Sequence, residues 1–150
     1  MFRRVLVHLD GDGAAPRVVA WVRRLLAPVR GDVRLLVVRP AVRGLIVDGR
    51  TVAYVHQRED AERARAGFAL ALLAAPLHDA GLSATTDVRF GEPATAILAA
   101  AVDWGADAVA VARRPVRGWR RWLTRDLTDD IVRRSPVPVL VVGGSPQRAA

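Results

Sequence analysis

Five short strand-like segments, separated by stretches whose apolar residues recur at helical spacing, constrain the fold of this chain most. Four of the segments are nearly continuous apolar runs, as expected of strands covered on both faces. The other one alternates polar and apolar residues, which fits a strand at the edge of a sheet. In chain order the predicted strands are Val5–Leu9, Val33–Val38, the alternating Ala84–Phe90, Ala108–Ala112 and Pro138–Val142.

The stretches between these strands predict four helices. The first follows Asp10–Gly13 and ends before Gly31, and the second spans Gln57–Ala80. The third begins at Glu92 and Pro93 and ends at Gly105, and the fourth begins at Asp126. Two apolar stripes are expected to face the core: Val18, Val22, Leu25 and Leu26, with Trp21 beside them, and Ile97, Leu98, Ala101 and Val102.

One segment, Ala41–Val55, lacks a clear period. It contains Gly44 and Gly49 and is predicted as a long loop, with room for an extra turn of helix or strand around Leu45–Val47.

Alternating strands and helices with short connections are typical of a parallel sheet with right-handed crossovers. The predicted fold class is therefore α/β: a three-layer, doubly wound, five-stranded parallel sheet with helices on both faces. A chain of 150 residues suits one domain. We expect a single domain over residues 1–150, with a flexible tail from 143 to 150.

Charge and composition narrow the function classes. The net charge is +8, and all 23 basic residues are arginine. Anionic partners are therefore expected. The chain has no cysteine, which excludes disulfides, thiolate catalysis and thiolate metal sites. The apolar run before Asp10 is too short for a signal peptide or a membrane span, so a cytoplasmic protein without membrane contact is expected.

The loop after the fourth strand concentrates the positive charge. It holds six arginines and no acidic residue: Arg113, Arg114, Arg117, Arg120, Arg121 and Arg125, interleaved with Trp119 and Trp122. One interpretation is a binding surface for a nucleotide, nucleic acid or another polyanion, with indole rings stacking on bases. The other is a solvated loop whose tryptophans pack on the body of the protein or on a partner.

No catalytic residue and no metal site are predicted. His8, His56 and His78 are far apart and lack metal-ligand spacing. His8 ends a buried strand beside Asp10, where a core histidine and a general base are both compatible with the sequence. No serine or threonine has an evident activating partner. We expect a protein that is not an enzyme, with slow nucleotide hydrolysis left open.

Three blocks of sequence resemble the universal stress protein family. They are RRVLVHLDGD at the start, FGEPATAILAAAVDWGADAVAVA in the third quarter, and RRSPVPVLVVG near the end. The resemblance implies the strand order 3-2-1-4-5 and a homodimer that pairs the last strands. An exposed apolar edge at Val137–Val142 favours the same dimer, because such an edge needs cover. A monomer shielded by Pro136 and Pro138 is the alternative.

Nucleotide-binding members of that family carry a loop of glycine, two residues, glycine, nine residues, glycine, and serine or threonine. The matching positions here are Ala112, Pro115, Arg125 and Asp126, and all four depart from the pattern. Proline has no N–H to donate, and a carboxylate at the helix start would repel a phosphate. The resemblance also gives Asp10 as a ribose contact and Val38 as an adenine contact.

The leading hypothesis is a dimeric regulatory or interaction module of this family, with no cofactor and without ATP in the glycine-rich loop. The alternative is a protein that binds ATP or AMP with arginines, above all Arg114 and Arg125, in place of the glycines. A third hypothesis is a polyanion or nucleic-acid binder that uses Arg113–Arg125.

Overall fold

The protein is described from a computed structural model that covers residues 2–11, 13–42, 46–47, 50–51, 54–113 and 126–143. Its main sheet has five strands: β1 (Arg4–His8), β2 (Asp32–Arg39), β5 (Ser83–Phe90), β6 (Ala108–Ala112) and β7 (Val139–Val142). All pairings in this sheet are parallel, and the spatial order is β5-β2-β1-β6-β7. The predicted order 3-2-1-4-5 is therefore confirmed.

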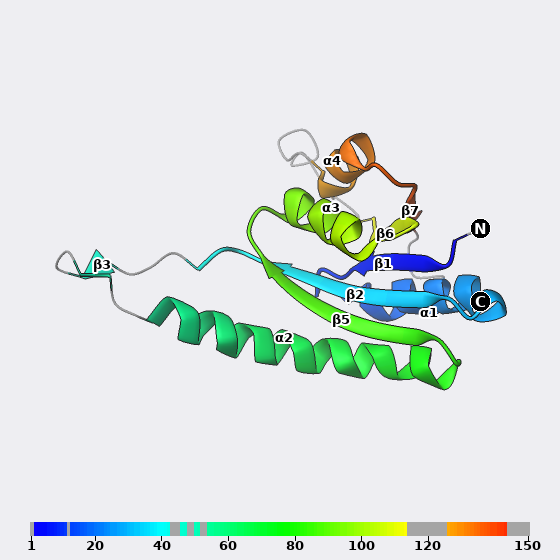
Figure 1. Cartoon of the computed structure of the whole chain (residues 1–150), viewed down its shortest axis with the longest axis horizontal. Coiled ribbons are helices and arrows are strands. Elements are labelled where there is room, and N and C mark those ends of the chain that lie inside the picture. The colour runs from blue at the N-terminus through cyan, green and yellow to red at the C-terminus, as the bar shows by residue number, and fades with distance from the viewer. Residues whose placement is uncertain are drawn as a thin grey trace, which may run out of the picture.

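Helices cover both faces of this sheet, as predicted (Figure 1). On one face lie α1 (Ala15–Leu26), which continues as the short 3-10 helix η1 (Ala27–Val29), and α2 (Tyr54–Asp79). On the other face lie α3 (Pro93–Trp104) and α4 (Leu127–Arg134). The alternating β5 is at one edge of the sheet, where its pattern predicts it, and β7 is at the other.

The two core layers follow from the alternation of side chains along the central strands. In β1, Val5 and Val7 are fully buried against α1 and α2, whereas Leu6 is fully buried in the layer beneath α3 and α4. In β6, Ala110 and Val109 divide between the same two layers. A strand buried on both faces reads as a continuous apolar run, which is why these segments stand out in the sequence.

The helix boundaries lie close to the predicted ones. Gly105 ends α3 in the left-handed conformation, with φ of 66°. Glu92 caps the start of α3: its carboxylate accepts hydrogen bonds from Ala94 N at 3.1 Å and Thr95 N at 2.7 Å. None of the helices in the described ranges is long and apolar enough to cross a membrane.

Two predicted core positions are wrong. Leu25 on α1 is 45% exposed and Val102 on α3 is 65% exposed, although the rest of both stripes is buried. Each residue lies at the margin of its stripe, where the neighbouring layer no longer covers it. Trp21, placed beside the first stripe, is 54% exposed.

The segment after β2 contains a two-stranded antiparallel ribbon of β3 (Ile46–Val47) and β4 (Arg50–Thr51). This ribbon supplies the extra strand for which the sequence analysis left room around Leu45–Val47. The tail from 144 to 150 lies outside the described residues.

Candidate functional site

The strand order of the sheet reverses at the carboxyl ends of β1 and β6. β1 lies between β2 and β6, with His8 in register with Val111. The chain leaves β1 toward β2 on one side and returns to β6 on the other. Open α/β sheets bind ligands at such a switch point, outside the carboxyl ends of the strands.

A small cavity lies at this point and brings together three of the predicted site residues. Asp10 follows β1, Ala112 ends β6, and Asp126 begins α4. The full lining is His8, Asp10, Val111, Ala112, Asp126, Leu127, Thr128 and Ile131. The cavity measures about 20 Å³, which is room for about one water molecule.

The N-terminus of α4 is capped by the protein's own carboxylate. Asp126 has an extended backbone, and its Oδ1 accepts a hydrogen bond from Thr128 N at 3.1 Å. Asp129 and Asp130 add two more carboxylates to the first turn. A helix N-terminus attracts anions through its N–H groups and its dipole. Here Asp126 takes one of those donors and adds negative charge beside Asp10.

His8 is 5% exposed and lines the same cavity as the two aspartates. The burial of His8 fits the core histidine that the sequence allows. In the described ranges, no group of histidine, aspartate or glutamate side chains is arranged to hold a metal ion.

The other predicted site positions lie elsewhere or outside the described residues. Val38, near the end of β2, packs against the core layer beneath α3 and α4 and is not among the residues that line the cavity. Arg113 is exposed, and its backbone N–H donates to Val142 O at 3.0 Å, which ties the end of β6 to β7. Arg114, Arg125 and the rest of the arginine loop lie outside the described residues.

Sequence reasoning missed Thr128 as part of this cavity. It is buried, and it stands two residues after the capping aspartate. The pattern Asp-x-Thr at the start of a helix signals the cap. It does not signal that the second residue turns toward the strands.

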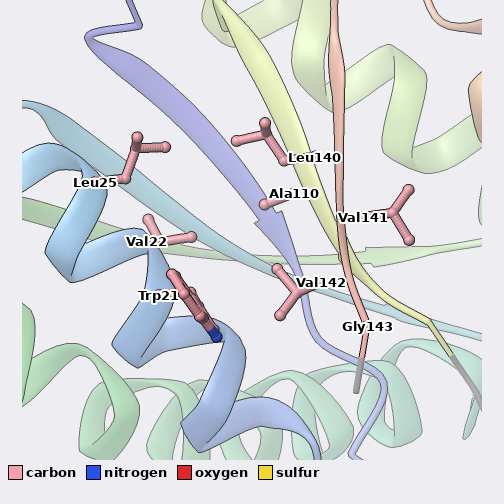
Figure 2. Close-up of a pocket in the computed structure, with 8 residues that line it drawn as sticks. All are labelled: Trp21, Val22, Leu25, Ala110, Leu140, Val141, Val142 and Gly143. Atoms are coloured by element: carbon pink, nitrogen blue, oxygen red, sulfur yellow. The ribbon is translucent and has the colours of Figure 1, made fainter.

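A larger hollow, also not predicted, lies between α1 and β7 (Figure 2). Its volume is about 350 Å³. We call it the α1–β7 groove; its lining residues are Trp21, Val22, Leu25, Ala110, Leu140, Val141, Val142 and Gly143. In Figure 2, Leu140 and Val142 point toward α1, whereas Val141 points away from it. The groove has no charged side chain and borders the edge strand, so it is a candidate interface.

Comparisons with known proteins agree with the resemblance seen in the sequence. The model of the universal stress protein family matches residues 1–143. No curated protein gives a significant match to the sequence. Three similar solved structures show the same fold.

The hypothetical protein MJ0577 is 19% identical with a TM-score of 0.76, and the match covers 98% of this chain and 99% of that one. The universal stress protein UspA from Lactobacillus plantarum is 18% identical with a TM-score of 0.74, covering 94% and 97%. A universal stress protein in complex with cAMP is 18% identical with a TM-score of 0.65, covering 96% and 98%.

Proposed function

The chain belongs to the universal stress protein family, and from this premise we propose that it is a cytoplasmic, homodimeric regulatory module of the stress response. In this proposal it is not an enzyme, and it does not hold ATP in the manner of the family's glycine-rich loop. Its function would then lie in its surfaces and in the partners that bind them.

The capped N-terminus of α4 is the observation that carries this proposal. Asp126 stands where the nucleotide-binding pattern has a hydroxyl, and its carboxylate accepts from Thr128 N while lining the cavity with Asp10. Two like charges a few ångströms apart repel by about one to several kcal/mol at surface-like dielectrics. A phosphate at this helix end would meet that repulsion without the glycine backbone that cradles it in other members.

The homodimer is supported by the edge strand and the α1–β7 groove. Within the described part of the chain, β7 pairs with β6 and with no other strand. Val109 N donates to Pro138 O and Arg113 N donates to Val142 O, so these alternate residues of β7 face β6. By the same alternation Val139 and Val141 present their backbone groups to the open side. A second copy paired antiparallel along this side would use those groups and bring apolar side chains to the groove.

A proline at position 141 tests the dimer. Val141→Pro removes an outward N–H without removing a hydrogen bond to β6, and edge strands tolerate proline at such a position. We expect sedimentation velocity at micromolar concentration to give a dimer for the natural chain and a folded monomer for Val141→Pro. The control is Val132→Ala, at an exposed apolar position on α4, and this variant should remain a dimer. A natural chain that is monomeric at this concentration would overturn the dimer.

A nucleotide-binding function is the second candidate, because a similar solved structure is a complex with cAMP. In that case arginines, Arg114 among them, would replace the glycine backbone as phosphate ligands. Mass spectrometry of small molecules released from the purified protein distinguishes the two candidates. The regulatory module should release no stoichiometric nucleotide. A stoichiometric adenine nucleotide that is lost in Arg114→Ala would favour the second candidate.

A further inference from the structure

The outward face of α2 carries a stripe of exposed apolar residues. Phe68 and Leu72 are 71% and 63% exposed, which is unusual for side chains of this size. Alanines extend the stripe by about two turns toward the start of the helix and by one turn toward its end. The α2 stripe consists of Ala61, Ala64, Phe68, Leu72 and Ala75, bounded by Gln57 and Asp79, and all seven residues are exposed.

The opposite face of α2 is held firmly on the sheet, which fixes the rotation of the helix. Ala66, Leu70, Ala74 and Leu77 are buried in the core. Arg63 donates to Val88 O at 2.7 Å and stacks on the ring of Phe90. With this face committed to β5 and β2, the α2 stripe points away from the molecule, and α2 forms its outer side (Figure 1).

Charge makes α2 suitable for contact with a second copy of the chain. The whole chain carries a net charge of +8, which opposes self-association. Along Tyr54–Asp79, however, three arginines stand against four carboxylates, so α2 itself is nearly neutral. Arg58 near the start of the helix is followed by Glu59 and Asp60, and Asp79 is its last residue. Two α2 helices can therefore approach each other without the net repulsion that the rest of the chain carries.

We propose that the α2 stripe is a second self-association surface, on which α2 of another copy packs antiparallel. A two-fold axis at Phe68 places the two Phe68 rings in contact and sets Ala61 of each copy opposite Ala75 of the other. Alanines at these positions permit helix axes about 8–10 Å apart. Gln57 of each copy then lies opposite Asp79 of the other.

This contact is separate from the proposed β7 dimer. α2 packs on β5, at the opposite edge of the sheet from β7. One helix pair buries less than the roughly 1,600 Å² of a standard interface, so the contact is weak and depends on concentration. A chain that uses both two-fold surfaces forms an assembly larger than a dimer.

Disulfide trapping tests the proposal cleanly, because the chain has no cysteine. Phe68→Cys should give a disulfide-linked dimer as the main product on a non-reducing gel after mild oxidation. The matched control is Val102→Cys, an equally exposed apolar position on α3, which should stay mostly uncross-linked. A mixture of Ala61→Cys and Ala75→Cys proteins should give mainly the mixed dimer, which requires an antiparallel arrangement.

The proposal is wrong if Phe68→Cys, folded by circular dichroism, cross-links no faster than Val102→Cys. It is also wrong if Phe68→Ser abolishes binding to phosphatidylglycerol vesicles but leaves the concentration dependence of sedimentation unchanged, because the stripe would then contact lipid.

Discussion

One carboxylate, that of Asp107, joins two separate parts of the chain at the amino-terminal ends of β1 and β6. Asp107 Oδ2 accepts hydrogen bonds from the backbone N–H groups of Arg3 and Arg4, both at 2.9 Å. Asp107 N in turn donates to Arg4 O at 2.8 Å. The start of β1 is thereby joined to the turn before β6. The hydrogen bond from Arg3 N, and after it the one from Arg4 N, holds the pKa of the Asp107 carboxyl below its ordinary value.

The lowered pKa of Asp107 predicts a pH-dependent contribution to stability. A carboxyl whose pKa is lower in the folded state stabilises the fold above its unfolded pKa, about 3.9 for aspartate. The contribution is lost as the pH falls through the lower, folded value. We therefore expect Asp107→Asn to lower the midpoint of urea unfolding at neutral pH, and the difference from the natural chain to shrink below about pH 4.

A control for this prediction is Asp79→Asn, a carboxyl at the exposed end of α2. Its neutral-pH unfolding midpoint should change less than that of Asp107→Asn. A difference between Asp107→Asn and the natural chain that stays constant from neutral pH to pH values well below the aspartate range would contradict the account.

At the scale of elements, local signals decide where helices and strands begin, and neighbouring layers decide what they bury. Short apolar runs predicted four strands of the main sheet, because strands covered on both faces must be apolar throughout. Alternation of polar and apolar residues predicted the fifth, β5, at an edge. Periodicity found the inner face of α1 and α3. It could not tell that Leu25 and Val102 lie beyond the cover of the next layer, because that depends on how far the packed elements extend.

Part of the candidate site could also be predicted from the sequence. Asp10, Ala112 and Asp126 follow or precede elements that meet at one edge of the sheet, so their convergence follows from the strand order. The inward turn of Thr128 and the α1–β7 groove depend on tertiary packing. Trp21, for example, lines the groove together with Leu140 and Val142 of β7, and no local pattern encodes which strand α1 will face.

The cap of α3 predicts a measurable loss of helix stability. Glu92 accepts from two backbone N–H groups, and Arg134 Nη1 lies 3.8 Å from its Oε2. We expect Glu92→Ala to reduce the free energy of unfolding by about 1 kcal/mol, the usual cost of a lost N-cap. Urea unfolding measures this loss. Glu92→Asp keeps a carboxylate that can cap the helix and should recover part of the lost free energy. A free energy of unfolding for Glu92→Ala equal to that of the natural chain would contradict the cap.

Replacement by alanine should change the stability of the fold in opposite directions at two glycines. A Cβ at Gly31 would lie 2.7 Å from Arg3 O, a backbone atom that cannot move away cheaply, so Gly31→Ala should destabilise the fold by about 1–3 kcal/mol. A Cβ at Gly67, inside α2, would have no neighbour within 4 Å. Gly67→Ala should therefore stabilise the fold by up to about 1 kcal/mol through helix propensity.

Thermal unfolding of the two alanine variants beside the natural chain checks the prediction. The melting temperature should fall for Gly31→Ala and rise for Gly67→Ala. Equal shifts in the same direction would show that close packing against Arg3 does not govern position 31.

At the scale of the whole molecule, the chain keeps the fold of the family, and we propose that its ligand chemistry differs. The sheet places Asp10, His8 and Asp126 around the switch point, but the cavity there is small and bordered by two carboxylates. The apolar surfaces lie elsewhere: the α1–β7 groove at one edge of the sheet and the α2 stripe beyond the other. This distribution favours a molecule that acts through contacts with other copies or partners.

Isothermal titration of magnesium-ATP into the purified chain shows whether the capped end of α4 excludes the nucleotide. The account predicts no saturable heat at micromolar protein concentrations. It also predicts that Asp126→Ser, which removes the capping carboxylate and supplies the family's hydroxyl, binds ATP more tightly than the natural chain. Saturable, stoichiometric binding by the natural chain that is lost in Asp10→Ala would contradict the account.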